Sequence, residues 1–286
     1  MKIEAAVPLA EPATLLLSFT NRHRALAAPA WNITLLYARR WGYAVRFVRG
    51  DDPDVFRASL QLHNKTMPPS WEKIPIMASA LNERTSSGAQ LYDAVVWLDD
   101  DLFINQHEVP VSSWISMLSQ RKKDLLLGAE RVQFDVALNL SWSPPNLGLL
   151  IVRNSPWSRS FFEQFLPSCT VDERLCSRCV WEQDCFDRLY VASMPDCAKG
   201  CKGKELAAAR HTHLTNAANL NCIPPIRNYW GLCEPWALHF MGHTKRYLHE
   251  SALLWRARGG QPLSQRTLCN QTKMRTEVAC QGMSTR

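Results

Sequence analysis

Two kinds of hydrophobic pattern alternate along this chain. Short continuous apolar runs that end in polar residues predict buried strands, whereas apolar residues that recur every three or four positions predict helices. The predicted strands cover residues 14–20, 44–48, 94–98, 125–129, 146–152 and 237–240. The predicted helices cover residues 29–41, 73–82, 111–119 and 155–166. Alternating strands and helices are typical of nucleotide-binding α/β folds, so we expect a Rossmann-like, mostly parallel central sheet flanked by helices.

The predicted strand at residues 94–98 ends in three adjacent carboxylates, Asp99, Asp100 and Asp101. Ligands of open α/β sheets bind just beyond the carboxyl ends of the strands, where these carboxylates would lie. Adjacent carboxylates repel one another, and a divalent cation that prefers oxygen ligands, Mg²⁺ or Mn²⁺, relieves that repulsion. Alternate residues of an extended chain point to the same side, so Asp99 and Asp101 are the predicted pair of metal ligands. A solvated acidic turn is the alternative.

The composition is that of an ordinary globular protein. The 286 residues are 46% hydrophobic and 21% charged, enough for one large α/β domain or two small ones. The 33 basic and 26 acidic residues leave a net charge of +7, but no run of five basic residues occurs, so we expect no nucleic-acid partner. No segment approaches the roughly 18 apolar residues that span a membrane. We therefore expect membrane association only through an anchor absent from this sequence.

All ten cysteines lie between residues 169 and 280. An even number of cysteines crowded into one half of a chain favours disulfides formed in an oxidising compartment. A zinc site is the alternative, because two closely spaced cysteine pairs occur there: Cys176 with Cys179, and Cys197 with Cys201. Disulfides are the preferred interpretation, because a zinc site would leave several cysteines without a role.

Four Asn-x-Ser/Thr sequons begin at Asn32, Asn64, Asn139 and Asn270. Composition alone predicts about 1.5 such tripeptides, so four is an excess. Together with the cysteines, they favour a glycoprotein of the secretory-pathway lumen. Residues 1–12 lack the apolar core of a signal peptide, so we expect a signal or anchor outside this sequence.

Five separated strings carry the evidence on function. They are Trp71-Glu72-Lys73-Ile74-Pro75, Asp99-Asp100-Asp101, the segment from Asn146 to Ser158, Glu182-Gln183-Asp184, and His239-Phe240-Met241-Gly242. In this order they resemble the retaining GT-A glycosyltransferases, most closely the family of fungal α-galactosyl- and α-mannosyltransferases and plant xyloglucan α-xylosyltransferases. The likeness spans residues 14 to 245, and its most specific string starts at Asn146. It implies a GT-A fold.

The resemblance implies a metal site built from Asp99, Asp101 and His239, with Mn²⁺ as the cofactor and Mg²⁺ as the alternative. Imidazole accompanies carboxylates at Mn²⁺ more readily than at Mg²⁺. The ion would neutralise charge on the leaving diphosphate of a nucleotide sugar. The sequence departs from the family pattern in two ways. The residue between the two aspartates is itself acidic, Asp100, so the ligand pair could shift to Asp100 and Asp101. A histidine, His243, follows the His239-Phe240-Met241-Gly242 string and could compete with His239.

The resemblance also implies residues that bind the donor and support the reaction. The donor, a nucleotide-diphosphate sugar, would contact Thr20, Lys73, Asp100, Asn146, Gly148, Gly242 and Lys245. The reacting face would be formed by Glu182, Gln183 and Asp184. Gln183 would support a short-lived oxocarbenium ion, and a neighbouring carboxylate would bind hydroxyl groups. For Lys73, the alternative is an ordinary lysine on the surface of a helix.

Aromatic and histidine side chains outside the five strings have weaker assignments. Trp142, Trp230 and Trp236 lie in predicted loops near the strings and are candidates for stacking on sugar rings. His211 and His213 lie in a polar segment, and we expect them to be solvated rather than metal-bound.

The sequence therefore predicts a metal-dependent retaining glycosyltransferase of the Golgi lumen, which transfers a hexose or pentose to a glycan or glycoprotein acceptor. Two alternatives stay open. A metal-dependent phosphohydrolase or nucleotidyltransferase would also use aspartates clustered after a strand. A non-catalytic sugar-binding protein descended from a glycosyltransferase would retain the fold.

The expected domain organisation follows from the same resemblance. We expect an N-terminal stub at residues 1–12, a GT-A catalytic domain at 13–245, and a C-terminal tail at 246–286 packed on that domain. Residues 13–105 would form the nucleotide-binding half and residues 106–245 the acceptor side. The acceptor side would include a cysteine-rich, loop-heavy region at residues 167–235.

Overall fold

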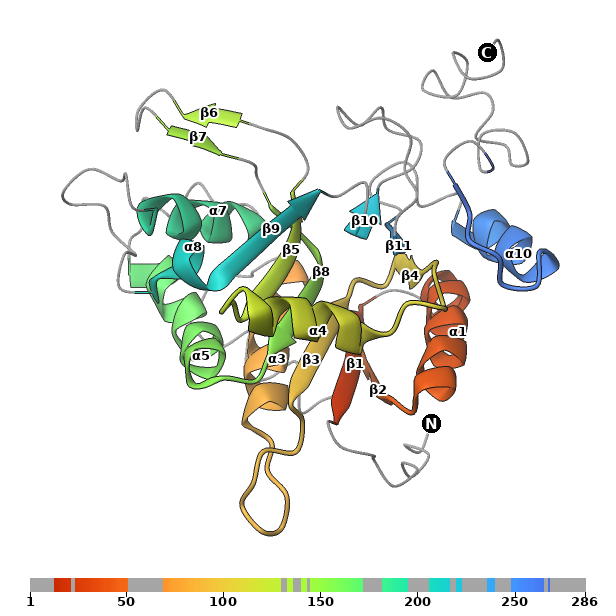
Figure 1. Ribbon diagram of the computed structural model, residues 1–286, viewed down its shortest axis with the longest axis horizontal. Helices are drawn as coiled ribbons and strands as arrows, with labels where there is room; N and C mark the ends of the chain where they lie inside the picture. Colours follow the sequence, from red (N-terminus) through yellow and green to blue (C-terminus); the bar gives the residue numbers. More distant parts are fainter. Residues whose placement is uncertain are drawn as a thin grey trace.

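The computed structural model describes residues 13–21, 24–50, 69–129, 133–135, 140–142, 145–171, 182–194, 206–216, 220–222, 236–239, 248–264 and 267. These residues form a central sheet with helices packed on both of its faces (Figure 1). None of the helices in these ranges is long and apolar enough to cross a membrane.

The central sheet has six strands in the order β2-β1-β3-β8-β5-β9. The strands are β1 (Thr14–Thr20), β2 (Ala44–Arg49), β3 (Ala94–Leu98), β5 (Leu125–Ala129), β8 (Pro145–Arg153) and β9 (Thr212–Asn216). Strand β1 is parallel to β2 and β3, β5 is parallel to β9, and β8 runs antiparallel to both of its neighbours. The expected mostly parallel sheet is therefore confirmed, with β8 as the exception.

Burial of the sheet on both faces explains the continuous apolar runs of its strands. In β3, Val95 and Trp97 belong to one core cluster, whereas Val96 and Leu98 belong to another, because alternate residues point to opposite faces. The first cluster includes side chains from α3 (Lys73–Asn82), α5 (Pro156–Val171) and α7 (Glu182–Ala192). The second includes side chains from α1 (Arg24–Trp41) and α4 (Val111–Gln120). Short helices η1 (Pro69–Glu72) and α8 (Ala208–His211) precede α3 and β9.

A second, three-stranded sheet brings a late part of the chain to the end of β3. Its strands are β10 (Asn221–Cys222), β11 (Ala237–His239) and β4 (Leu102–Ile104), in that order. Strand β11 is antiparallel to β4, and His239 is the register partner of Leu102. His239 is thereby carried next to Asp101. A separate hairpin is formed by β6 (Gln133–Asp135) and β7 (Leu140–Trp142).

Helix α10 (Leu248–Ala257) packs on α1 (Figure 1). Trp255 and Ala252 share an apolar cluster with Ile33 of α1. Beyond the helix, Asn105 donates from Nδ2 to the carbonyl of Leu263 (3.1 Å) and accepts from its N–H (2.8 Å). Residues 248–264 thus pack on the rest of the chain, and the division into domains stays a prediction.

Helix α1, helix α7 and strand β9 are among the elements that differ from the sequence-based prediction. Helix α1 begins at Arg24, so Pro29 lies inside it, where its missing N–H leaves one helical hydrogen bond unformed. Helix α7 and strand β9 both fall in the region predicted to be loop-heavy. The sequence of β9, Thr-His-Leu-Thr-Asn, is largely polar because it lies at the edge of the sheet, so it lacks the apolar run of a central strand.

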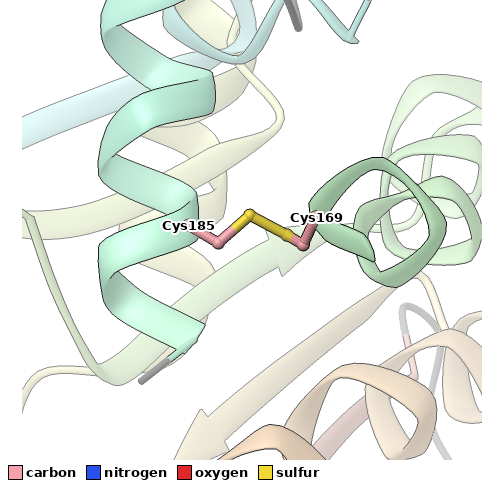
Figure 2. Close-up of a disulfide and its surroundings, with 2 residues drawn as sticks. All are labelled: Cys169 and Cys185. Atoms are coloured by element: carbon pink, nitrogen blue, oxygen red, sulfur yellow. A yellow bond between two sulfur atoms is a disulfide. The ribbon is translucent and has the colours of Figure 1, made fainter. Parts of the chain in front are cut away.

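A disulfide joins Cys169 of α5 to Cys185 of α7, and both cysteines are fully buried (Figure 2). The expectation of disulfides is confirmed for this pair. The four cysteines of the zinc alternative lie outside the described residues. Among the sequon asparagines, Asn32 lies exposed on α1, and the other three lie outside the described residues.

Candidate metal and donor site

The candidate site lies at the carboxyl edge of the parallel strands. Strand β1 ends there at Thr20, and β3 ends there just before Asp99. The antiparallel β8 begins at the same edge, and the N–H of Asp99 donates to the carbonyl of Gly148 (2.9 Å). Side chains from the beginning of one strand and the ends of two others therefore meet at one place.

The three aspartates lie in a turn rather than in an extended strand. The N–H of Leu102 donates to the carbonyl of Asp99 (3.0 Å), which closes the turn. Asp99 and Asp101 approach His239, with Nε2 at 3.7 Å from Asp99 Oδ2 and 3.2 Å from Asp101 Oδ1. Asp100 accepts instead from the Oγ1 hydroxyl of Thr20 (2.6 Å). The predicted pairing of Asp99 with Asp101 is present, but the extended geometry on which it was argued is wrong.

Gly148 makes room for the imidazole of His239. A Cβ atom at position 148 would lie 2.0 Å from His239 Cε1 and 2.7 Å from Nε2, so any larger residue would displace the ring. The His239 side chain is 2% exposed, and its Nδ1 has no hydrogen-bond partner among the described residues. Gly148 was predicted to line the sugar pocket. Its observed contact is with the predicted third metal ligand.

Asp99, Asp101 and His239 fit a divalent cation. One ligand atom from each of them lies within 4.8 Å of the others. Adjacent ligands of an octahedral ion at 2.0–2.1 Å lie about 3 Å apart, close to the 3.2 and 3.7 Å separations observed from His239 Nε2. Two carboxylates and an imidazole are chemically suited to Mn²⁺, and a shift of the ligand pair to Asp100 is disfavoured by the contact of Asp100 with Thr20.

Lys73 is a buried residue that joins three parts of the site. Its ammonium donates to the carbonyl of Leu147 (2.9 Å) and pairs with Glu182 Oε1 (2.7 Å) and Asp99 Oδ1 (3.2 Å). Burial alone would lower the pKa of Lys73, but the two carboxylates outweigh it and raise that pKa. The alternative of a surface lysine is therefore wrong, because the side chain is 3% exposed.

The other oxygen contacts of the site orient polar groups around β8. Trp97 Nε1 donates to Asp99 Oδ1 (2.7 Å), on the side of the carboxylate away from His239. Asn146, which is buried, accepts the N–H of Gly148 through Oδ1 (2.8 Å). Gln183 accepts the N–H of Leu147 through Oε1 (3.3 Å).

Glu182, Gln183 and Asp184 form the first turn of α7. Glu182 is buried, whereas Gln183 and Asp184 are half-buried. Figure 1 shows α7 on the side of the sheet near β8 and β9. The predicted reacting residues therefore adjoin β8, and one of them reaches the metal-ligand cluster through Lys73.

No model of a known protein family matches the chain. A variediene synthase of Emericella variicolor is 44% identical over 55 residues, which is 17% of this chain and 8% of that protein. That match is too short to indicate a family, because the chain spans less than a tenth of the relative's length.

Three solved structures resemble the chain in fold. A glycosyltransferase involved in glycosylation of the major capsid of PBCV-1 aligns over 85% of this chain and 100% of its own, with 16% identity and a TM-score of 0.56. The galactosyltransferase LgtC, solved with donor and acceptor sugar analogues, aligns over 86% and 99% (12% identity, TM-score 0.46). Mouse xyloside xylosyltransferase 1 aligns over 81% and 98% (11% identity, TM-score 0.46).

The chain has the GT-A fold. The similarity to the viral glycosyltransferase supports this through the architecture alone, because an identity of 16% says nothing of substrate. The two scores of 0.46 are too low to support an argument. Within the GT-A fold, Asp99, Asp101 and His239 occupy the carboxyl edge of the sheet, where open α/β folds bind ligands.

Other predicted residues are placed differently or are not described. Trp236 is not a platform for sugar rings, because it is fully buried between Tyr37 and Trp114 and donates to the carbonyl of Val109. The predicted donor contacts Gly242 and Lys245 lie outside the described residues. The same is true of His243, Trp230 and the side chain of Trp142.

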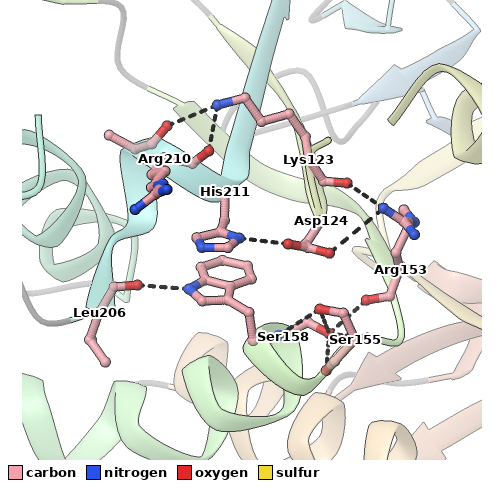
Figure 3. Close-up of polar contacts among 10 residues, drawn as sticks. Lys123, Asp124, Arg153, Ser155, Ser158, Leu206, Arg210 and His211 are labelled. Carbon is pink, nitrogen blue, oxygen red and sulfur yellow. Dashed lines mark hydrogen bonds and ion pairs between the residues drawn. The ribbon is translucent and has the colours of Figure 1, made fainter. Parts of the chain in front are cut away.

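His211 was predicted to be solvated rather than metal-bound; its side chain is 28% exposed and also has protein partners. Its Nδ1 lies 2.6 Å from Asp124 Oδ2 (Figure 3), and its ring stacks on Trp157 with centroids 4.5 Å apart. Asp124 also faces Arg153 (3.8 Å). This cluster lies at the opposite edge of the central sheet from Asp99, because Asp124 precedes β5 and Arg153 ends β8.

The sequence-based interpretation missed the hydrogen bond from Trp97 to Asp99 in the candidate site, which a local signal could have indicated. Trp97 is the penultimate residue of β3, and its indole N–H is a donor that a buried side chain must satisfy. The nearest acceptor along the chain is Asp99, two residues later on the same side of a strand. By contrast, no local signal indicates that Leu147 supplies both a carbonyl to Lys73 and an N–H to Gln183.

Proposed function

We propose that this chain is a metal-dependent retaining glycosyltransferase. It would move a hexose or pentose from a nucleotide-diphosphate sugar to a glycan or glycoprotein acceptor. The observation that carries the proposal is the convergence of Asp99, Asp101 and His239 at the carboxyl edge of a GT-A fold. The resemblance to fungal and plant family members supports a retaining outcome.

Asp99, Asp101 and His239 would hold Mn²⁺, with Mg²⁺ as the alternative. When bound, the ion would neutralise negative charge on the diphosphate leaving group. Lys73 and Trp97 hold Asp99 Oδ1, so that Oδ2 is left facing His239. Such supporting contacts tune metal affinity, because they fix the direction of the ligand's lone pairs.

Retention is best explained without a covalent enzyme intermediate. Glu182 is buried in an ion pair with Lys73, and Gln183 is a neutral amide, so neither is a good nucleophile. We propose that the acceptor oxygen attacks the anomeric carbon on the face from which the diphosphate departs. The carbon–oxygen bond to the diphosphate breaks, the new glycosidic bond forms, and the acceptor proton passes to a diphosphate oxygen. A covalent sugar adduct trapped on Glu182 or Asp184 would contradict this route.

The other donor contacts remain predictions from the resemblance. Thr20 and Asp100 are hydrogen-bonded to each other at the end of β1, and Asn146 and Gly148 begin β8. We assign Lys73 to orienting Asp99 and Glu182 rather than to direct contact with the donor, since its ammonium is already surrounded by three oxygen atoms. Asp184 would bind hydroxyl groups of the donor or the acceptor.

A nucleotide-sugar panel tests the function. UDP-galactose, UDP-glucose, UDP-xylose and GDP-mannose are titrated by calorimetry with Mn²⁺ and with EDTA. We expect one of them to bind only with the metal, and Asp101→Ala to abolish that binding. Glu108→Ala is the control, because Glu108 is 71% exposed and pairs with Arg40 in the last turn of α1 rather than with a residue of the candidate site. Release of monophosphate from free nucleotides would favour a phosphohydrolase, and metal-independent sugar binding would favour a non-catalytic protein.

A lumenal location in the secretory pathway, the Golgi in particular, is part of the proposal. The buried disulfide between Cys169 and Cys185 supports it, since such bonds persist in oxidising compartments. Immunolocalisation of the endogenous protein, combined with endoglycosidase digestion, would test it. Cytosolic staining with no mobility shift would contradict it.

A further inference from the structure

Helix α7 presents a reacting-site residue and a disulfide on the same side. Glu182, Cys185, Phe186 and Leu189 are all buried, at the i, i+3, i+4 and i+7 spacing of one helical face. Cys185 therefore lies about 4.5 Å along the helix axis from Glu182. Figure 2 shows the disulfide passing from this helix to the end of α5.

The first turn of α7 is linked to the metal-ligand cluster by two polar contacts. Glu182 pairs with Lys73 at 2.7 Å, and Lys73 pairs with Asp99 at 3.2 Å. Gln183 accepts the N–H of Leu147, next to Gly148. The first contact joins α7 to Lys73 of α3, and through Lys73 to Asp99. The second joins α7 to β8. Both depend on distance and direction, because an ion pair or hydrogen bond weakens steeply when its atoms move apart.

The ring contacts of Phe186 with α5 do not provide such directional control. Phe186 of α7 lies 5.9 Å from Phe161 and 6.3 Å from Phe165 of α5, measured between ring centroids. Apolar packing is not directional and tolerates small rotations of a helix. The disulfide, in contrast, limits the separation of the two helices at Cys169 and Cys185, one turn from Glu182.

We propose that the Cys169–Cys185 disulfide is a positioning element of the donor site. It fixes how the first turn of α7 is rotated about the helix axis and how closely that turn approaches the sheet. It thereby aligns Glu182 with Lys73 and Gln183 with β8. The donor site is therefore complete only in the oxidised protein. That this site binds the donor rests on the proposed function, whereas the contacts of Glu182 and Gln183 are observed in the structure.

The test uses the full chain with Cys169→Ala/Cys185→Ala, Glu182→Gln, and the combination of all three changes. Mn²⁺-dependent binding of UDP or GDP, whichever the unaltered chain binds, is measured by calorimetry below the unfolding range of every variant. We expect the cysteine variant and Glu182→Gln each to weaken binding about 10- to 100-fold. Because both changes act through the same ion pair, the combination should weaken binding no more than the stronger single change.

Val191→Ala is the matched control, because Val191 is buried near the other end of the same helix. It destabilises α7 with the disulfide intact, and we expect it to leave nucleotide affinity within about twofold of the unaltered chain. An equal loss of affinity in Val191→Ala would overturn the proposal, since it would show that any loss of stability in α7 has the same effect. If the double-alanine variant does not fold, Cys169→Ala/Cys185→Val retains more of the buried volume and replaces it.

Failure of this proposal can be separated from failure of the proposed function. If the unaltered chain binds nucleotide and the cysteine variant binds it equally well, the positioning role is wrong and the proposed function stands. If the unaltered chain binds neither nucleotide, the proposed function fails. The free energies of urea unfolding of the unaltered chain, the cysteine variant, Glu182→Gln and their combination then decide the positioning role. Additive losses of stability would refute coupling between the disulfide and Glu182, and non-additive losses would support it.

Discussion

At each end of the central strands a histidine lies beside at least one carboxylate, but the balance of positive and negative charge differs between the two ends. At the carboxyl edge, Asp99 and Asp101 both approach His239. At the opposite edge, the single carboxylate of Asp124 lies between His211 and Arg153. The first edge therefore has an excess of negative charge around one imidazole, whereas the second has its carboxylate shared by two basic side chains.

The side chains around the two histidines add to the difference in charge balance between the two ends of the strands. Lys73 is the basic partner of both Asp99 and Glu182, so two carboxylates share one ammonium. Asp101 adds a third carboxylate, which approaches His239. At the opposite end of the strands, the Lys123 ammonium donates to the carbonyl of Arg210 (Figure 3), and the His211 ring stacks on Trp157. The comparison teaches that a histidine and an aspartate in contact do not by themselves indicate a metal site. A surplus of ligand oxygen atoms around the imidazole does.

A third histidine extends the comparison to a site with no carboxylate contact in the described structure. His107 packs between Tyr37 (5.3 Å) and Trp255 (4.5 Å), and its Nε2 has no hydrogen-bond partner in that part of the chain. Burial, aided by the positive charge of Arg40, lowers the pKa of His107 to about 4. Two, one and no carboxylates thus surround His239, His211 and His107, and the following predictions test the three environments.

The largest expected effect is on metal binding. Asp99→Asn/Asp101→Asn should weaken Mn²⁺ binding at least about 1,000-fold, because two of the three ligands lose their charge. Asp124→Asn should leave Mn²⁺ affinity unchanged, although it removes the partner of His211. Calorimetric titration of Mn²⁺ into both variants measures this. Equal losses in the two variants would show that the two edges do not differ as argued.

Removal of the shared ammonium should cost stability. Lys73→Met should lower the free energy of unfolding by about 3 kcal/mol, because Glu182 would be left as an uncompensated buried charge. Lys73→Met/Glu182→Gln should recover more than half of that loss. Urea unfolding at neutral pH provides the measurement. A loss below about 1 kcal/mol in the single variant would mean that the ion pair is not buried as observed.

The close approach of Gly148 to His239 predicts a smaller effect on metal affinity. Gly148→Ala should weaken Mn²⁺ binding about 10- to 100-fold, because the added Cβ would lie 2.0 Å from His239 Cε1 and displace the ring. His239→Ala alone should cause a similar loss of Mn²⁺ affinity. Adding Gly148→Ala to His239→Ala should cause no further loss of Mn²⁺ affinity. Additive losses would indicate that the glycine acts on something other than the imidazole.

The smallest effect is a pH dependence from His107. Since its pKa in the folded protein lies below the ordinary value of 6.5, the unfolded chain binds the proton more readily. The stabilising effect of the neutral ring is therefore complete above pH 6.5 and is lost as the pH falls towards 4. We expect a loss of about 2 kcal/mol over that window. His107→Phe should flatten the pH profile of urea unfolding between these values, and an unchanged slope would refute the assignment.

Much of the sheet could be predicted from local patterns, whereas several side-chain environments could not. The bounds predicted for β1, β3 and β5 match the structure, because both faces of these strands are buried and their sequences are uniformly apolar. The antiparallel direction of β8 and the edge strand β9 were not predicted. A continuous apolar run has the same pattern in a parallel and an antiparallel strand, so it does not indicate direction. An edge strand is only partly covered and does not need a continuous apolar run.

The candidate site shows the same division. Asp99 and Asp101 could be proposed as ligands from their position after an apolar run, and His239 entered through resemblance to a family. The burial of Lys73 was missed, since an isolated lysine at the start of a predicted helix has the pattern of a surface residue. Trp236 was misassigned to the sugar pocket for a related reason, because a tryptophan in an irregular segment has no periodicity from which its burial could be predicted.

The sequence by itself determined where the buried strands β1, β3 and β5 lie and which carboxylates follow β3, because these depend on the solvation preferences of neighbouring residues. The tertiary structure alone decided that His239 meets Asp99 and Asp101, through the pairing of β11 with β4. It also decided that Gly148 and Lys73 support that meeting, through the reversed direction of β8. These contacts join residues that are distant along the chain, and their energies depend on a packing geometry that no local pattern encodes.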